Sequence, residues 1–187
     1  MVRSRIAALL VASIVFSAGA VHAQSLFTGL LTGHIGAAVN GDVGDATTTA
    51  GVSLAVVDIS GFGAEIDVAH TGAFDKQFFA DSSVTSFMVN FIGLYPDERF
   101  RPFVTVGAGL LRLRTSLVSG QTPVGHTKVA WDAGGGLFYM ASDFFALRGD
   151  VRYFRLFERP TDLVLRDSGF FDYWRSSIGA TFSWPIK

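Results

Sequence analysis

The chain has 187 residues, a formal net charge of −1, no cysteine and 49% hydrophobic residues. This length suits one domain, and the near-neutral charge gives no support to a nucleic-acid partner. A chain without cysteine has neither a disulfide framework nor a lipid-modified N-terminal cysteine.

Residues 1–23 are predicted to be a secretory signal peptide. Arg3 and Arg5 precede an apolar run from Ile6 to Phe16, and Val21-His22-Ala23 has the small-x-small pattern of a cleavage site. The apolar run is shorter than the roughly 18–20 residues that span a bilayer, which argues against a membrane anchor. Cleavage would leave a mature domain over residues 24–187.

The mature chain has the pattern of strands. No apolar run after residue 23 reaches the roughly 18 residues that a spanning helix needs. Apolar and polar residues instead alternate, as they do on the two faces of a strand. These segments are about twice as long as strands of soluble proteins, which have about 5–6 residues, so a soluble periplasmic β-protein is disfavoured. The eight expected strands cover about Phe27–Val39, Thr48–Val57, Phe62–Thr71, Ser83–Leu94, Pro102–Leu113, Thr127–Tyr139, Phe144–Arg155 and Asp172–Trp184.

Most of these segments separate an apolar face from a polar one. The apolar faces, which we expect to contact lipid, include Leu147, Val151, Ile178 and Phe182. An arginine facing lipid near the midplane costs roughly 2–4 kcal/mol, so the charged faces are expected inside a barrel. Residues 83–94 and 102–113 are apolar on both faces, and their register is left open. The charged faces supply Glu65, Asp67, Lys128, Asp132, Arg148, Asp150, Arg152 and Arg175.

The connections between the segments alternate in length. Those near 58–61, 95–101 and 140–143 are short, whereas those near 40–47, 72–82, 114–126 and 156–171 are long. Short periplasmic turns, long extracellular loops and an even number of strands are typical of outer-membrane barrels. The sequence therefore predicts an all-β fold, an eight-stranded antiparallel transmembrane β-barrel.

Three stretches resemble a known family. They are Arg101–Gly109, Asp150–Phe154 and Ile178–Trp184, which are similar to strands of the small OmpA/OmpX-type outer-membrane β-barrel family. The resemblance implies the outer membrane of a Gram-negative bacterium, with surrounding lipid and lipopolysaccharide. It also implies the barrel-insertion machinery and periplasmic chaperones as partners during biogenesis. Family members usually end on an aromatic residue, whereas Pro185, Ile186 and Lys187 follow Trp184 here.

We interpret the charged faces as a structural ion network, since an eight-stranded barrel is just wide enough to be filled by side chains. A narrow or gated conduit through the same groups is the alternative. His34 is expected inside and His70 and His126 near loop ends, and their spacing matches no metal motif. No local motif supports a serine–histidine–carboxylate triad. The sequence thus predicts no catalytic residue, cofactor or metal site.

These observations favour a non-enzymatic integral outer-membrane protein. Its expected role is in envelope integrity or in surface interaction through the loops near 72–82, 114–126 and 156–171. A small channel, or a transporter that passes hydrophobic molecules into lipid, is the first alternative. A lipid-modifying outer-membrane hydrolase is the second. The sequence names no surface ligand.

Overall fold

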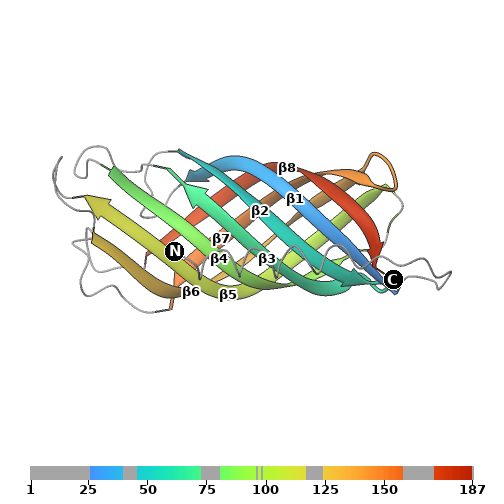
Figure 1. The fold of residues 1–187 in the computed structure, drawn as a ribbon, viewed down its shortest axis with the longest axis horizontal. Helices are drawn as coiled ribbons and strands as arrows, with labels where there is room; N and C mark the ends of the chain where they lie inside the picture. The colour runs from blue at the N-terminus through green and yellow to red at the C-terminus, as the bar shows by residue number, and fades with distance from the viewer. Residues whose placement is uncertain are drawn as a thin grey trace, which may run out of the picture.

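The computed structural model is a closed barrel of antiparallel strands in the order β1 to β8, with β1 and β8 side by side (Figure 1). The structure describes residues 26–39, 46–72, 81–95, 97, 99–116, 124–157 and 171–186. The predicted signal peptide and most of the predicted long loops lie outside these residues. No helix in the described ranges is long and apolar enough to cross a membrane.

Each predicted segment forms a strand. The first and third have the predicted bounds, and β5 and β6 extend several residues further. β8 continues past Trp184, because Pro185 and Ile186 pair with Thr28 and Phe27 of β1. The strands are β1 (Phe27–Val39), β2 (Thr47–Asp58), β3 (Phe62–Thr71), β4 (Asp81–Leu94), β5 (Phe100–Ser116), β6 (Val124–Met140), β7 (Phe145–Leu156) and β8 (Asp172–Ile186).

The turn between β2 and β3 shows how the short connections are made. Asp58 Oδ1 accepts hydrogen bonds from the backbone N–H groups of Ser60 and Phe62, at 2.9 and 3.0 Å. Gly61 has a φ of 89°, a conformation that suits glycine. A Cβ at Gly61 would also collide with the carbonyl oxygen of Leu94. This turn and its two counterparts lie at one end of the barrel, which we call the short-turn end; the other is the long-loop end.

The outer wall is apolar, as predicted for a barrel in lipid. Ile178 is 69% exposed and Val104 is 66% exposed, and Leu147, Val151 and Phe182 are also exposed.

The structure fixes the register that the sequence left open in β4 and β5. Their buried inward side chains are Val84, Ser86, Met88, Asn90, Ile92 and Leu94 of β4, and Phe103, Thr105, Leu111 and Leu113 of β5.

Aromatic residues gather on the outer wall near both ends. At the short-turn end, Phe62 stacks on Phe91 with ring centroids 5.8 Å apart, and Phe182 stacks on Trp184 at 5.9 Å. Towards the long-loop end, Tyr153 contacts both Trp131 and Trp174, with centroids 5.6 and 5.1 Å apart. Two such girdles mark the interfaces of a membrane-spanning barrel.

Candidate functional site in the barrel interior

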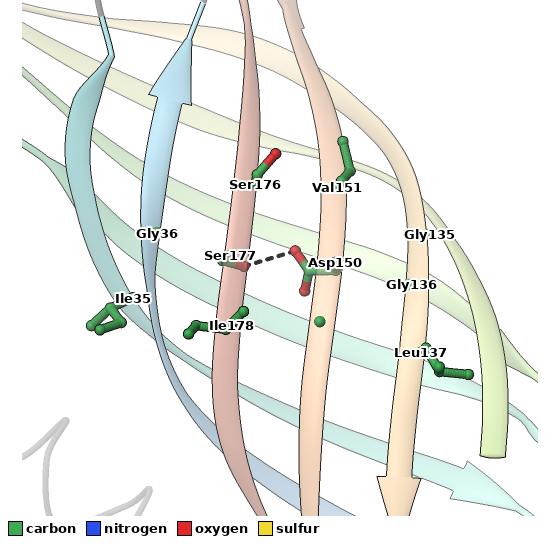
Figure 2. A pocket seen from close by; sticks show the side chains of 11 residues that line it. Ile35, Gly36, Gly135, Gly136, Leu137, Asp150, Val151, Ser176, Ser177 and Ile178 are labelled. Carbon is green, nitrogen blue, oxygen red and sulfur yellow. Dashed lines mark hydrogen bonds between the residues drawn. The ribbon is translucent and has the colours of Figure 1, made fainter.

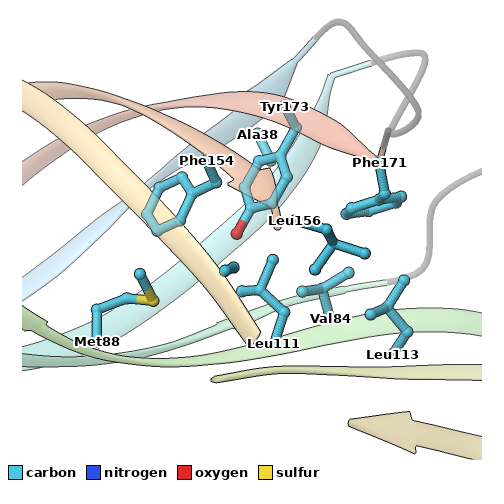
Figure 3. Packing of buried hydrophobic residues seen from close by; sticks show 10 residues of the cluster. Ala38, Val84, Met88, Leu111, Leu113, Phe154, Leu156, Phe171 and Tyr173 are labelled. Carbon is cyan, nitrogen blue, oxygen red and sulfur yellow. The ribbon is translucent and has the colours of Figure 1, made fainter. Parts of the chain in front are cut away.

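The barrel interior consists of three layers. The layer at the short-turn end is apolar, and we call it the short-turn cluster. The layer at the other end, the long-loop cluster, is also apolar, and its rings and aliphatic chains interdigitate (Figure 3). Charged side chains fill the space between the two. The short-turn cluster comprises Leu30, Ala55, Val57, Ile92, Leu94, Phe103, Phe138 and Ala146. The long-loop cluster comprises Ala38, Val84, Met88, Leu111, Leu113, Ala130, Phe154, Leu156, Phe171 and Tyr173.

Glu65 of β3 is the centre of the charged layer. Its Oε2 lies 2.5 Å from Arg148 Nη1 and its Oε1 lies 2.6 Å from Arg152 Nη2, and the Glu65 side chain is fully buried. Both arginines belong to β7, which stands across the barrel from β3 in the closed strand order. The carboxylate therefore ties two opposite walls of the lumen together with charge-assisted hydrogen bonds.

A second carboxylate, Asp67, links three strands. Its Oδ1 accepts a hydrogen bond from Arg175 Nη2 of β8 at 2.9 Å. Its Oδ2 lies 3.0 Å from His34 Nε2 of β1. All three side chains are buried. Asp67 thus joins β3 to the two strands that close the barrel.

The remaining carboxylates lie around the arginines of β7. Asp150 Oδ2 accepts from Arg148 Nε at 2.9 Å, and its Oδ1 accepts from the hydroxyl of Ser177 at 2.9 Å (Figure 2). Arg152 Nη1 lies 3.6 Å from Asp132 Oδ2. In the amide orientation that satisfies both of its groups, Asn90 donates to Asp132 Oδ1 at 2.7 Å and accepts from Arg152 Nη1 at 2.8 Å.

Two arginines also contact the apolar layers. The Arg148 guanidinium lies 4.5 Å from the ring centroid of Phe103 and 5.1 Å from that of Phe138, both in the short-turn cluster. The Arg175 guanidinium lies 4.9 Å from the centroid of Phe154, in the long-loop cluster. Cation–π attraction compensates N–H groups that have no oxygen acceptor among the described residues, including Arg148 Nη2 and Arg175 Nη1. The charged layer is therefore packed against both apolar layers.

Glycines on the inner wall make room for the network. A Cβ at Gly107 would collide with the side-chain amide of Asn90, and a Cβ at Gly134 would lie 2.8 Å from Cγ of Arg152. In a narrow barrel a side chain at either position would displace a member of the network. The glycine-rich runs at 107–109 and 134–136 thus serve close packing within strands, as their placement in the sequence suggests.

The model of the family described as Outer membrane protein beta-barrel domain matches residues 8–184. The chain belongs to this family. A search of curated proteins gives no match.

Several solved outer-membrane proteins have the same fold. Neisserial surface protein A gives a TM-score of 0.63 at 14% identity, covering 87% of this chain and 98% of that chain. OprG from Pseudomonas aeruginosa gives 0.62 at 13% identity, with the same coverage. Ail, the attachment invasion locus protein of Yersinia pestis, gives 0.58 at 16% identity, covering 86% of this chain and 100% of that chain. At such identities the likeness shows the fold alone.

In this outer-membrane β-barrel, seven of the eight sequence-predicted interior residues come together: Glu65, Asp67, Asp132, Arg148, Asp150, Arg152 and Arg175. Lys128 lies outside the network. It occupies an inward register position on β6, paired with Leu111 of the long-loop cluster, and makes no ion pair with any residue in the described ranges. Sequence reasoning missed Asn90, whose inward position followed only once the β4 register was known.

Two described histidines, His34 and His70, have side-chain hydrogen-bond partners. No group of three or more His, Asp or Glu side chains there could hold a metal ion. His34 pairs with Asp67, but its Nδ1 has no hydrogen-bond partner in the described ranges, so no described serine is held beside it. His70 is exposed, and its Nδ1 lies 3.0 Å from the Thr85 hydroxyl.

A shallow groove of about 450 Å³ runs along the outer wall over β6, β7, β8 and β1 (Figure 2). Ile35, Leu137, Val151 and Ile178 form its sides, and glycine backbone forms much of its floor. The sides of this groove are apolar and face the surroundings of the barrel, and the network residues Asp150 and Ser177 also line it.

Proposed function

We propose that the protein is a non-enzymatic, non-conducting integral protein of the outer membrane of a Gram-negative bacterium. In this proposal, residues 1–23 direct export and are removed. The role of the protein is in envelope integrity or in surface interaction through the segments 72–82, 114–126 and 156–171.

The filling of the lumen is the observation that carries this proposal. A water-filled channel needs a continuous polar path, whereas here an ionic layer lies between two apolar clusters. Each cluster contains large side chains that are at most 1% exposed: Ile92 and Phe138 in the short-turn cluster, and Phe154 and Leu111 in the long-loop cluster. An ion would have to pass both buried apolar layers and then break Arg–carboxylate pairs, each of which is costly to disrupt when buried.

A surface role also suits relatives with this fold. Ail of Yersinia pestis was crystallised in complex with the heparin analogue sucrose octasulfate, so one such barrel binds a ligand of the sulfated-sugar class. With the lumen of the present barrel filled, its loops and its outer wall are what remains available for interaction.

Conductance measurements test the non-conducting part of this proposal. The folded protein in planar bilayers should give no steady openings, with folding checked by heat-modifiable gel mobility. A second variant, Phe138→Ala with Phe103→Ala, thins the short-turn cluster and removes the two rings beside Arg148 but keeps every ion pair of the charged layer, and it should also fail to conduct. Steady, sizeable openings from the unmodified protein would favour a channel.

Epitope insertion tests the orientation. A tag inserted within 117–123 should be accessible to antibody on intact cells, whereas the same tag inserted after Ile59 should be accessible only after the outer membrane is permeabilised. Outer-membrane fractionation of both tagged proteins serves as the control for correct assembly. The reverse accessibility would contradict the proposed location of the loops.

A further inference from the structure

The outer wall of β5 carries two arginines near the long-loop end. Arg112 and Arg114 are exposed, while Leu111 and Leu113 between and beside them are buried in the long-loop cluster. Alternation along the strand therefore directs both guanidinium groups away from the barrel axis. Their Cα atoms are separated by about 7 Å, within reach of two long side chains that bind one anion.

Neighbouring strands add hydrogen-bond donors and no described negative charge. Arg112 is flanked across the sheet by Thr85 of β4 and Thr127 of β6. The hydroxyl of Thr85 in turn contacts exposed His70 of β3. Among residues whose side chains the structure describes, the outward positions of β3 to β6 hold no carboxylate, and neither arginine forms an ion pair. Asp81, the first residue of β4, has the outward parity of Ser83 and pairs with Ser116, beyond the level of both arginines.

The height of this patch corresponds to the edge of the lipid-facing wall. From Phe100 to Leu110 the outward residues of β5 are uncharged and mostly apolar. About ten residue steps of roughly 3.3 Å, tilted by about 40°, cover about 25 Å, which matches the apolar band of outer-membrane barrels. Arg112 is the next outward residue above this band. On β6, β7 and β8 the aromatic contacts of Tyr153 with Trp131 and Trp174 lie towards the same end.

We propose that Arg112 and Arg114 bind the phosphate groups of lipopolysaccharide in the outer leaflet. This inference rests on the proposed orientation, which puts the long-loop end at the cell surface. Guanidinium groups hold phosphate through paired, charge-assisted hydrogen bonds, and exposed Leu110, Phe87 and Val129 directly below offer an apolar surface to the acyl chains. A phosphorylated lipid can contact both the two guanidinium groups and the apolar surface below them, whereas a soluble anion contacts only the guanidinium groups.

The test compares two double variants with equal loss of charge. Arg112→Gln with Arg114→Gln removes the patch, and Arg99→Gln with Arg101→Gln removes two arginines at the short-turn end. Both proteins are refolded in detergent, checked by heat-modifiable mobility, and titrated with purified lipopolysaccharide by native mass spectrometry. We expect the first variant to bind about 10- to 100-fold more weakly and the second to bind within about threefold of the unmodified protein.

Intact lipopolysaccharide, dephosphorylated lipopolysaccharide and inorganic phosphate are compared to identify the chemistry of the ligand. The first arm uses enzymatically dephosphorylated lipopolysaccharide. It should bind the unmodified protein about as weakly as intact lipopolysaccharide binds the Arg112/Arg114 variant. In the second arm, inorganic phosphate at equimolar concentration should not displace bound lipopolysaccharide. Equal weakening by both double variants, or equal binding of the dephosphorylated lipid, would overturn the inference. Complete displacement by equimolar phosphate would assign the patch to soluble anions and also overturn it. Because these measurements use folded protein in detergent, they can fail while the epitope experiment still supports the proposed orientation.

Discussion

Arg148→Met should destabilise the barrel by about 3–5 kcal/mol, because the variant leaves buried carboxylates without one of their partners. Arg148 contacts Glu65 at 2.5 Å and Asp150 at 2.9 Å. Methionine retains much of the contact with the rings of Phe103 and Phe138. The loss of stability therefore measures the removal of the charge and not the opening of a cavity.

The size of this loss of stability depends on the hydrogen-bond partners that each carboxylate keeps in the variant. Glu65 retains Arg152 at 2.6 Å, whereas Asp150 retains the Ser177 hydroxyl and, at 3.7 Å, Arg152. Each lost charge-assisted hydrogen bond contributes about 1.5–3 kcal/mol, and water entering the space lowers the sum towards 3–5 kcal/mol. Adding Asp150→Asn should recover about half of the loss, because the more poorly compensated carboxylate is then neutral.

Equilibrium unfolding by urea in lipid vesicles, followed by tryptophan fluorescence and gel mobility, measures this free energy. Arg155→Met is the matched control: it removes an arginine from the outward face of the same strand and should change stability by less than about 1 kcal/mol. The reasoning is refuted if Arg148→Met costs no more than this control, or if Asp150→Asn gives no recovery.

Other expectations can be checked independently. Mass spectrometry of the mature protein should find Gln24 as the first residue; a Met1 start would contradict cleavage. Cysteine at Val151 or Ile178 should react with lipid-phase probes and resist water-soluble thiol reagents, and rapid labelling by the latter would reverse the assigned face. Gly61→Ala should cost at least about 1–2 kcal/mol, because φ is 89° there and the added Cβ would also collide with the carbonyl oxygen of Leu94; an unchanged urea midpoint would argue against this strain.

The sequence predicts the faces of strands whose two sides differ chemically. In β3, Glu65 and Asp67 alternate with Ile66 and Val68, and only one register keeps the charges out of lipid. The same reasoning applies to β7 and β8. Alternation, strand number and connection lengths therefore give the barrel before any tertiary contact is known.

The register of β4 and β5 could not be predicted, for a reason that the structure makes clear. Their inward residues include Met88, Ile92, Leu111 and Leu113, which build the two apolar clusters, so both faces of these strands are apolar. The alternation of apolar and polar residues also predicts which face of the sheet a side chain lies on, but not which residue of another strand it contacts. Arg148 and Glu65 are 83 positions apart, and Lys128 has the inward parity of Asp132 yet lies at the level of the long-loop cluster.

The ionic layer helps to fix how neighbouring strands of the barrel align with one another. A one-residue slip of β7 would turn Arg148 and Arg152 towards lipid, at roughly 2–4 kcal/mol each near the midplane. That penalty is comparable with a total stability of about 5–15 kcal/mol. No charged residue lies near the middle of β4 or β5, so a slip of either strand carries no penalty of this size. Their register is fixed instead by pairing with β3 and β6 and by Asn90, which must face Asp132 and Arg152 to be satisfied. Charges on a few strands thus determine the alignment of apolar neighbours that could otherwise slide.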